Sequence, residues 1–148
     1  MSDTEDGTPG DDARGVVADA TARLVAPFAA TFGLFTTFHG TSSVGGGFQG
    51  GVVLAATVIL LAFAVGPPRV RAALAVPRTS ALAAGGVLGF AAVGVGPVAF
   101  GGAVLELAAY PIPKPAVYAT ELAEVAIAAT VAATLVGLFF VLAGETDA

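Results

Sequence analysis

Long apolar runs with hardly any charge divide this chain. The run at 48–66, for example, holds no charged residue. A helix needs about 20 mostly apolar residues to cross a lipid bilayer, because each residue advances it by about 1.5 Å. Further apolar runs lie at about 20–38, 79–105 and 116–143. The pattern predicts an all-α integral membrane protein with four transmembrane helices and short loops.

Composition supports a lipid environment and excludes several classes of protein. Hydrophobic residues make up 56% of the chain and charged residues 11%, where a soluble domain carries about 25% charged residues. The 148 residues leave no extramembrane segment large enough to form its own core. The chain has no cysteine, which excludes disulfides and thiolate metal sites.

Both ends of the chain are polar. Residues 1–19 hold six acidic side chains against Arg14 alone, and this excess equals the net charge of −5. With its interspersed glycine and proline, this segment is predicted to be a disordered cytoplasmic tail. Residues 20–143 form the membrane domain, and 144–148 a short polar C-terminal end. No basic patch is present, so we expect no nucleic-acid partner.

The loop at 67–78 sets the expected orientation. Pro67-Pro68 ends the second span, and three arginines follow within the loop: Arg69, Arg71 and Arg78. Positive charge concentrates in cytoplasmic loops. With four spans, both termini are then cytoplasmic, and the loops near 39–47 and 106–116 face outward. We expect a multi-pass protein of the cell (plasma) membrane.

Five of the twenty glycines fall between positions 45 and 51, and Phe48 and Gln49 interrupt them. Glycines spaced four residues apart allow two helices to approach closely in lipid. This spacing occurs in the pairs Gly46 and Gly50, Gly47 and Gly51, and Gly85 and Gly89. A phosphate-binding loop would need Lys-Ser or Lys-Thr after its glycines. Val52-Val53 follows instead. We therefore predict a helix-packing turn that comprises Gly45, Gly46, Gly47, Phe48, Gln49, Gly50 and Gly51.

Two acidic residues in the fourth span are candidates for an ion path. Glu121 and Glu124 lie three residues apart, and so on adjacent parts of one helix face. A carboxylate within a membrane is costly and usually faces a protein interior or an aqueous path. Another interpretation stays open. The uncharged run 125–143 is long enough to cross the bilayer by itself, which would leave both acids at the outer interface.

His39, the only histidine, ends the first span. Its unperturbed pKa near 6.5 suits proton handling, which makes it a third candidate for the ion path. An interfacial role, in which it only caps the helix end, is an equal alternative. A lone histidine does not make a metal site, since catalytic zinc needs three protein ligands. We expect no metal, no cofactor and no enzymatic activity in this chain.

The stretch His39-Gly40-Thr41-Ser42-Ser43-Val44-Gly45-Gly46-Gly47-Phe48-Gln49-Gly50-Gly51 resembles the MnhB/MrpB-like subunits of multisubunit Na⁺/H⁺ antiporters. The family pattern reads approximately His-Gly-His-x-x-Pro-Gly-Gly-Gly-Phe-x-Gly-Gly. Thr41 replaces a second histidine, and Val44 replaces a proline. The likeness extends over about residues 20–143, and Ala123-Glu124-Val125-Ala126 is similar to the family's Leu-Glu-Val-Gly/Ala segment.

This resemblance implies an accessory membrane subunit of a monovalent cation/proton antiporter. Its partners would be the other antiporter subunits and the lipid bilayer, with Na⁺ and H⁺ as the ions that the complex transports. Glu124 would match the family glutamate. Two alternatives remain open, namely an equivalent subunit of a membrane-bound hydrogenase-type complex and a purely structural helix-packing subunit.

Overall fold

The computed structural model describes residues 9–40, 46–74 and 76–145, and every regular element in them is helical. The longer helices are α1 (Pro9–Phe38), α2 (Gly47–Val65), α4 (Val76–Val95) and α5 (Pro115–Glu145). The short helix α3 (Pro67–Leu74) joins α2 to α4. Two 3-10 helices, η1 (Gly96–Phe100) and η2 (Leu107–Ala109), lie between α4 and α5.

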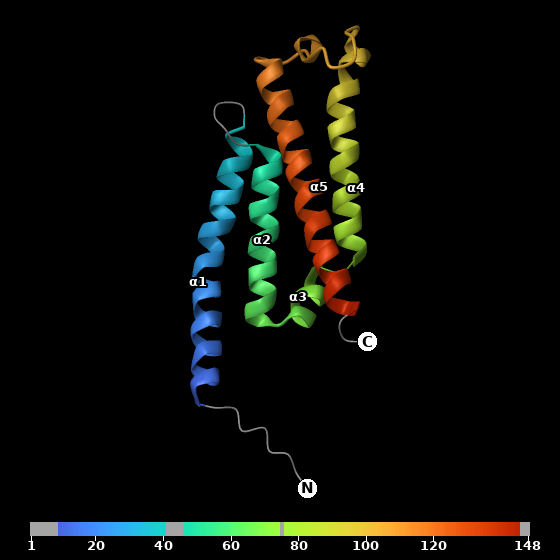
Figure 1. Ribbon diagram of the computed structural model, residues 1–148. Coiled ribbons are helices and arrows are strands. Elements are labelled where there is room, and N and C mark those ends of the chain that lie inside the picture. The colour runs from blue at the N-terminus through green and yellow to red at the C-terminus, as the bar shows by residue number, and fades with distance from the viewer. Residues whose placement is uncertain (1–8, 41–45, 75, 146–148) are drawn as a thin grey trace.

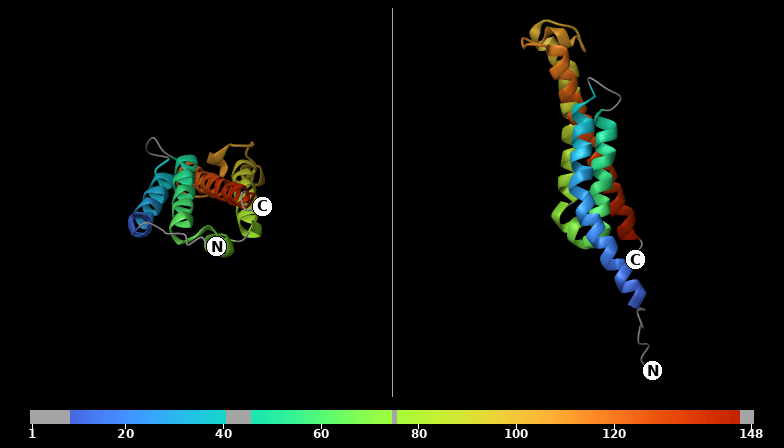
Figure 2. Two further views of the ribbon diagram at one scale, coloured as in Figure 1. Left: turned by 60° about the horizontal axis from the view of Figure 1, so that its bottom comes forward. Right: turned by 90° about the vertical axis from the view of Figure 1, so that its left-hand side faces the viewer.

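The long helices stand side by side in the order α1, α2, α5, α4, so the last helix inserts between the second and the fourth (Figure 1). Seen from its edge, the bundle is thin (Figure 2). The start of α1, the end of α5 and α3 lie at one end of the bundle, and the glycine turn and the segment 96–114 lie toward the other.

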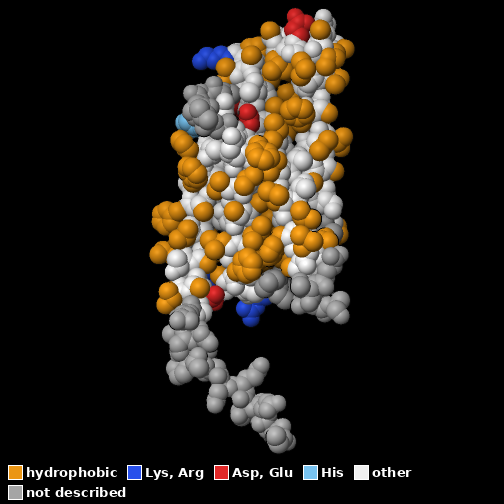
Figure 3. All heavy atoms as spheres, viewed as in Figure 1, with side chains coloured by type: hydrophobic (Ala, Val, Ile, Leu, Met, Phe, Trp, Pro, Cys, Tyr) orange, Lys and Arg blue, Asp and Glu red, His pale blue; other side chains and the backbone are white. Residues whose placement is uncertain are grey.

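The helices meet through small side chains and expose large ones. Ala55 and Ala62 on α2 are at most 1% exposed, whereas Phe28 on α1 and Leu88 on α4 are each 70% exposed. Orange hydrophobic side chains cover much of the visible surface, and the coloured charged groups lie mostly toward its two ends, with red acidic atoms also visible further in (Figure 3). Lipid tails accept such an exterior, and small residues in the seams are typical of transmembrane helix packing.

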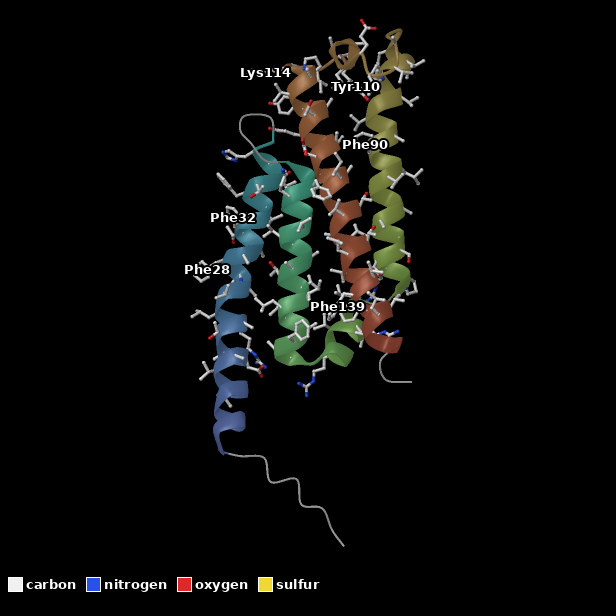
Figure 4. The ribbon with its side chains drawn as sticks, viewed as in Figure 1. Phe28, Phe32, Phe90, Tyr110, Lys114 and Phe139 are labelled. Atoms are coloured by element: carbon white, nitrogen blue, oxygen red, sulfur yellow. The ribbon has the colours of Figure 1, made fainter. Side chains whose placement is uncertain are left out.

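The main apolar core lies between α2 and α5, near α3. Its fully buried members are Ala55, Ala62, Val136 and Phe140. Phe139 packs against this cluster and meets Phe63 edge-on with ring centroids 5.6 Å apart. Phe28 and Phe32, by contrast, point away from the bundle (Figure 4).

Within the described residues, three helical segments are long and apolar enough to cross a membrane: Gly47–Val65, Pro77–Phe100 and Pro115–Gly144. The protein is therefore an all-α membrane protein with three candidate spans. The helix α1 is not among them. Its apolar stretch is diluted by Arg23 and by four threonines, Thr21, Thr31, Thr36 and Thr37.

The first helix begins earlier than expected. The helix α1 starts at Pro9 instead of near position 20, so residues 9–19 are helical where we predicted disorder. Proline is favoured at a helix start because its missing N–H would have no partner there. The first turns continue past the end of the bundle (Figure 2). Residues 1–8 and 146–148 lie outside the described residues, and α5 runs on to Glu145.

The segment 67–78, predicted as a loop, is also largely helical. Gly66, with φ of 94°, ends α2, and Pro67 opens α3. Val70 and Leu74 lie four residues apart, and both pack against the core between α2 and α5. This one-sided burial stabilises a helix that the charge and the two prolines of the segment concealed.

The third span ends earlier than the predicted residue 105. The α-helix gives way to η1 at Gly96, where Pro97 cannot donate a backbone hydrogen bond. Gly101 then adopts φ of 82°, and the chain folds back until the Leu105 N–H donates to the Gly94 carbonyl at 2.8 Å. This return places residues 101–105 beside the end of α4.

Candidate functional site

The start of α2 meets the first third of α5 at Glu124. The backbone N–H of Gly47, the first residue of α2, donates to a carboxylate oxygen of Glu124. N–H groups in the first turn of a helix have no acceptor within the helix. The residue before α2, Gly46, has no side chain to supply one. Glu124 therefore caps α2 from a different helix.

Three glycines make room for this carboxylate, which is half-buried. An ideal Cβ on Gly40 would lie 3.0 Å from one Glu124 oxygen, and one on Gly46 would lie 2.7 Å from the other. A Cβ on Gly47 would collide with the Glu124 backbone carbonyl. Any side chain at these positions would displace either the carboxylate or the α5 backbone.

The glycine motif continues this close packing along α2. An ideal Cβ on Gly50 would lie 2.7 Å from the Gly33 carbonyl of α1, and one on Gly51 would lie 2.8 Å from the Ala128 carbonyl of α5. Phe48 and Gln49 are exposed. The pattern of the motif thus has a physical cause, because α2 approaches α1 and α5 through glycines and turns its two larger side chains away. Gly45 lies outside the described residues.

The other two ion-path candidates relate to this site differently. Glu121 is half-buried, one turn before Glu124 on α5, but the atoms nearest to Gly40 and Gly46 include none of its atoms. The His39 ring stacks on Phe35 of its own helix, with centroids 3.9 Å apart. Its chain neighbour Gly40 is the residue that reaches Glu124. The structure thus joins Glu124 to the glycine turn through Gly40, Gly46 and Gly47.

A second close seam joins α4 to α5, and here the spacing rule selected the wrong glycine. An ideal Cβ on Gly86 would lie 2.6 Å from the Ala126 carbonyl, whereas one on Gly85 would meet nothing within 4 Å. The one on Gly89 would make ordinary contact at 3.6 Å. The Thr130 hydroxyl donates to Ala126 O at 2.9 Å and lies 3.4 Å from Ala83 O across the seam. Sequence reasoning missed Gly86, although its place beside Gly85 was a signal.

Beside this seam lies an apolar groove of about 540 Å³, with the exposed Gly85 among its lining residues. Tyr110 lies at the loop end of the groove (Figure 4), where its hydroxyl donates to the Val93 carbonyl at 2.9 Å. The groove is lined by glycines and alanines together with larger apolar side chains such as Leu82, Leu122 and Val125.

Residues 17–146 match the protein-family model described as a domain related to the MnhB subunit of Na⁺/H⁺ antiporter. The match includes all of α2, α3, α4 and α5 and most of α1. It also contains the glycine turn and Glu124. No curated protein matches the chain.

Proposed function

The chain belongs to the family of domains related to the MnhB subunit of Na⁺/H⁺ antiporters, as a subunit of a multisubunit Na⁺/H⁺ antiporter, and we propose that it serves the complex both in assembly and in an ion path. Its partners are other subunits of the antiporter. The observation that carries the proposal is the half-buried Glu124 carboxylate, which is held at the seam between α2 and α5 in a largely apolar bundle. Carboxylates in such surroundings commonly mark ion or proton pathways.

In this proposal Glu124 contributes most directly to the path, and Glu121 and His39 tune it from the next turn of α5 and from the end of α1. A purely structural role is the second candidate. It is favoured by the number of α2 glycines that contact neighbouring helices. The two roles differ in whether they need the negative charge of Glu124. An ion path needs the charge, whereas helix packing needs only the volume of the side chain.

We further propose that α1 crosses the membrane as a fourth span, with both termini on the cytoplasmic side of the plasma membrane. The helix α1 lies along α2 (Figure 1). Three of its threonine hydroxyls donate to carbonyls one turn back, those of Pro27, Phe32 and Gly33, at 2.8–2.9 Å. Such back-bonding lets a threonine face lipid without an unpaired donor. Arg69, Arg71 and Arg78 would then lie at the cytoplasmic end.

The proposed ion path is tested by Glu124→Gln in the assembled complex, with Na⁺-dependent ΔpH measured in membrane vesicles. We expect the rate of Na⁺/H⁺ exchange to fall about tenfold or more. Weakening the interaction of the ion with Glu124 by only about 1.4 kcal/mol would already lower its occupancy of the path about tenfold. The matched control is Glu121→Gln, the same change one turn away, for which we expect a smaller loss. If the Glu124→Gln complex assembles normally and its Na⁺-dependent ΔpH is unchanged, the ion-path role is ruled out.

A further inference from the structure

We propose that Glu124 is also a positioning residue, whose negative charge fastens the start of α2 and the end of α1 to α5, so that neutralising this carboxylate loosens that attachment. The inference rests on the proposed place of Glu124 in the ion path. It adds that an ion bound at Glu124 changes how firmly α2 is held to α5. A proton or a cation that neutralises Glu124 would weaken the attachment between α2 and α5.

The first support is the form of the contact. The Gly47 N–H donates to Glu124 at the very start of α2. Hydrogen bonds to an ionised acceptor are roughly twice as strong as neutral ones. The partial positive charge at a helix N-terminus adds to the attraction, because Glu124 lies where that charge is concentrated. Both contributions depend on the carboxylate being ionised.

The second support is that the residue after α1 and the residue before α2 approach the same carboxylate. Gly40 follows α1 and Gly46 precedes α2, and an ideal Cβ on either would lie within 3.0 Å of a Glu124 oxygen. The two glycines also approach each other, since an ideal Cβ on Gly40 would lie 2.9 Å from the Gly46 Cα. A single side chain from α5 therefore contacts the chain where it leaves α1 and where it enters α2.

Few other ionisable groups lie near this contact. On α5 they are Tyr118, one and a half turns away, and Glu121. On α1 His39 adjoins Gly40, and α2 has no ionisable side chain from Gly47 to Val65. Residues 41–45 are Thr, Ser, Ser, Val and Gly, also without one. No lysine or arginine occurs in these segments to take over the role of the carboxylate.

Hydrogen–deuterium exchange of the intact antiporter complex tests the inference at the amides of Gly47 and Gly50. Gly47 donates to Glu124, and Gly50 donates to the Gly46 carbonyl at 3.0 Å. Glu124→Gln keeps the size and an acceptor oxygen but removes the charge, so we expect these amides to exchange about tenfold faster. Glu121→Gln is the matched control and should leave them unchanged.

Glu124→Asp supplies a second variant, because it keeps the charge but shortens the side chain. We expect the amides of Gly47 and Gly50 in this variant to exchange at a rate between the rates of the wild type and of Glu124→Gln. Wild-type amide exchange in Glu124→Gln would overturn the positioning role. Faster amide exchange with unchanged Na⁺-dependent ΔpH would instead overturn the ion-path role and leave the fastening role in place. The two proposals can therefore fail separately.

Discussion

Gly46 combines an unusual backbone conformation with a place against a carboxylate. Its φ is 140°, a value that residues with a side chain rarely adopt, and an ideal Cβ there would lie 2.7 Å from one Glu124 oxygen and 3.0 Å from the other. Gly101 shares the positive φ, at 82°, but an ideal Cβ there meets nothing within 4 Å. The two glycines also differ in ψ, which is −175° at Gly46 and 8° at Gly101. Gly46 thus lies in a region essentially reserved for glycine, whereas Gly101 lies in the left-handed helical region.

We expect Gly46→Ala to destabilise the subunit by more than Gly101→Ala. Both variants introduce backbone strain, of about 1–3 kcal/mol, and we expect the larger strain at Gly46 because its φ and ψ are the less accessible to alanine. Only Gly46→Ala also forces the carboxylate out of its contacts, at a further cost of about 1–3 kcal/mol. The measurement is the temperature at which the subunit leaves the purified complex. Equal losses for the two variants would show that the carboxylate contact adds no stability.

At this scale the sequence identified the residues but not their contact. An acid in an apolar run indicates Glu124, and a dense glycine motif indicates Gly46 and Gly47. The hydrogen bond between Gly47 and Glu124 joins residues 77 positions apart. No local pattern indicates which turn of α5 lies beside α2. That relation arises only when α5 inserts between α2 and α4.

At the scale of the helices, the α4–α5 seam depends on one glycine of an adjacent pair. Gly86 is buried against the backbone of α5, whereas Gly85 is exposed on the groove side. Adjacent residues on a helix point in directions about 100° apart, so Gly85 and Gly86 lie on different faces. A spacing rule does not say which of these two faces meets the neighbouring helix. The same limit explains why the Gly85–Gly89 spacing predicted the seam but not the contacting residue.

The pair supplies a matched test of helix packing. Gly86→Ala places a Cβ against the Ala126 carbonyl, so we expect a loss of about 1–3 kcal/mol in stability from overpacking. Gly85→Ala should be neutral or stabilising by up to about 1 kcal/mol, because alanine is the better helix former. Thermal unfolding of the purified complex measures both. A stable Gly86→Ala variant would contradict the close α4–α5 contact.

For the molecule as a whole, apolar run length located α2 and α5 well, but it placed the end of α4 too late and did not reveal α3 or the true start of α1. The second and fourth spans match their helices to within two residues at each end. The helix α3 was missed because its stability comes from Val70 and Leu74 packing on distant helices. The early start of α1 was missed because acidic residues with glycine and proline suggest disorder, although the chain continues helically.

The proposed four-span topology predicts where single cysteines become accessible. The chain has no cysteine of its own, so Val16→Cys and Val104→Cys introduce unique sites. Both positions are exposed and lie toward opposite ends of the bundle. A membrane-impermeant maleimide should label the Val104→Cys variant from outside and the Val16→Cys variant only from the cytoplasmic side. Labelling of both from one side would contradict a crossing by α1.

Purification of the tagged, full-length chain from its native membrane tests the central claim most directly, namely that this is a subunit of a multisubunit Na⁺/H⁺ antiporter. Mass spectrometry identifies the proteins that leave the membrane with it. We predict that the other antiporter subunits co-purify in fixed proportion. Recovery of the chain alone, or with nickel–iron hydrogenase and iron–sulfur subunits in their place, would contradict the account.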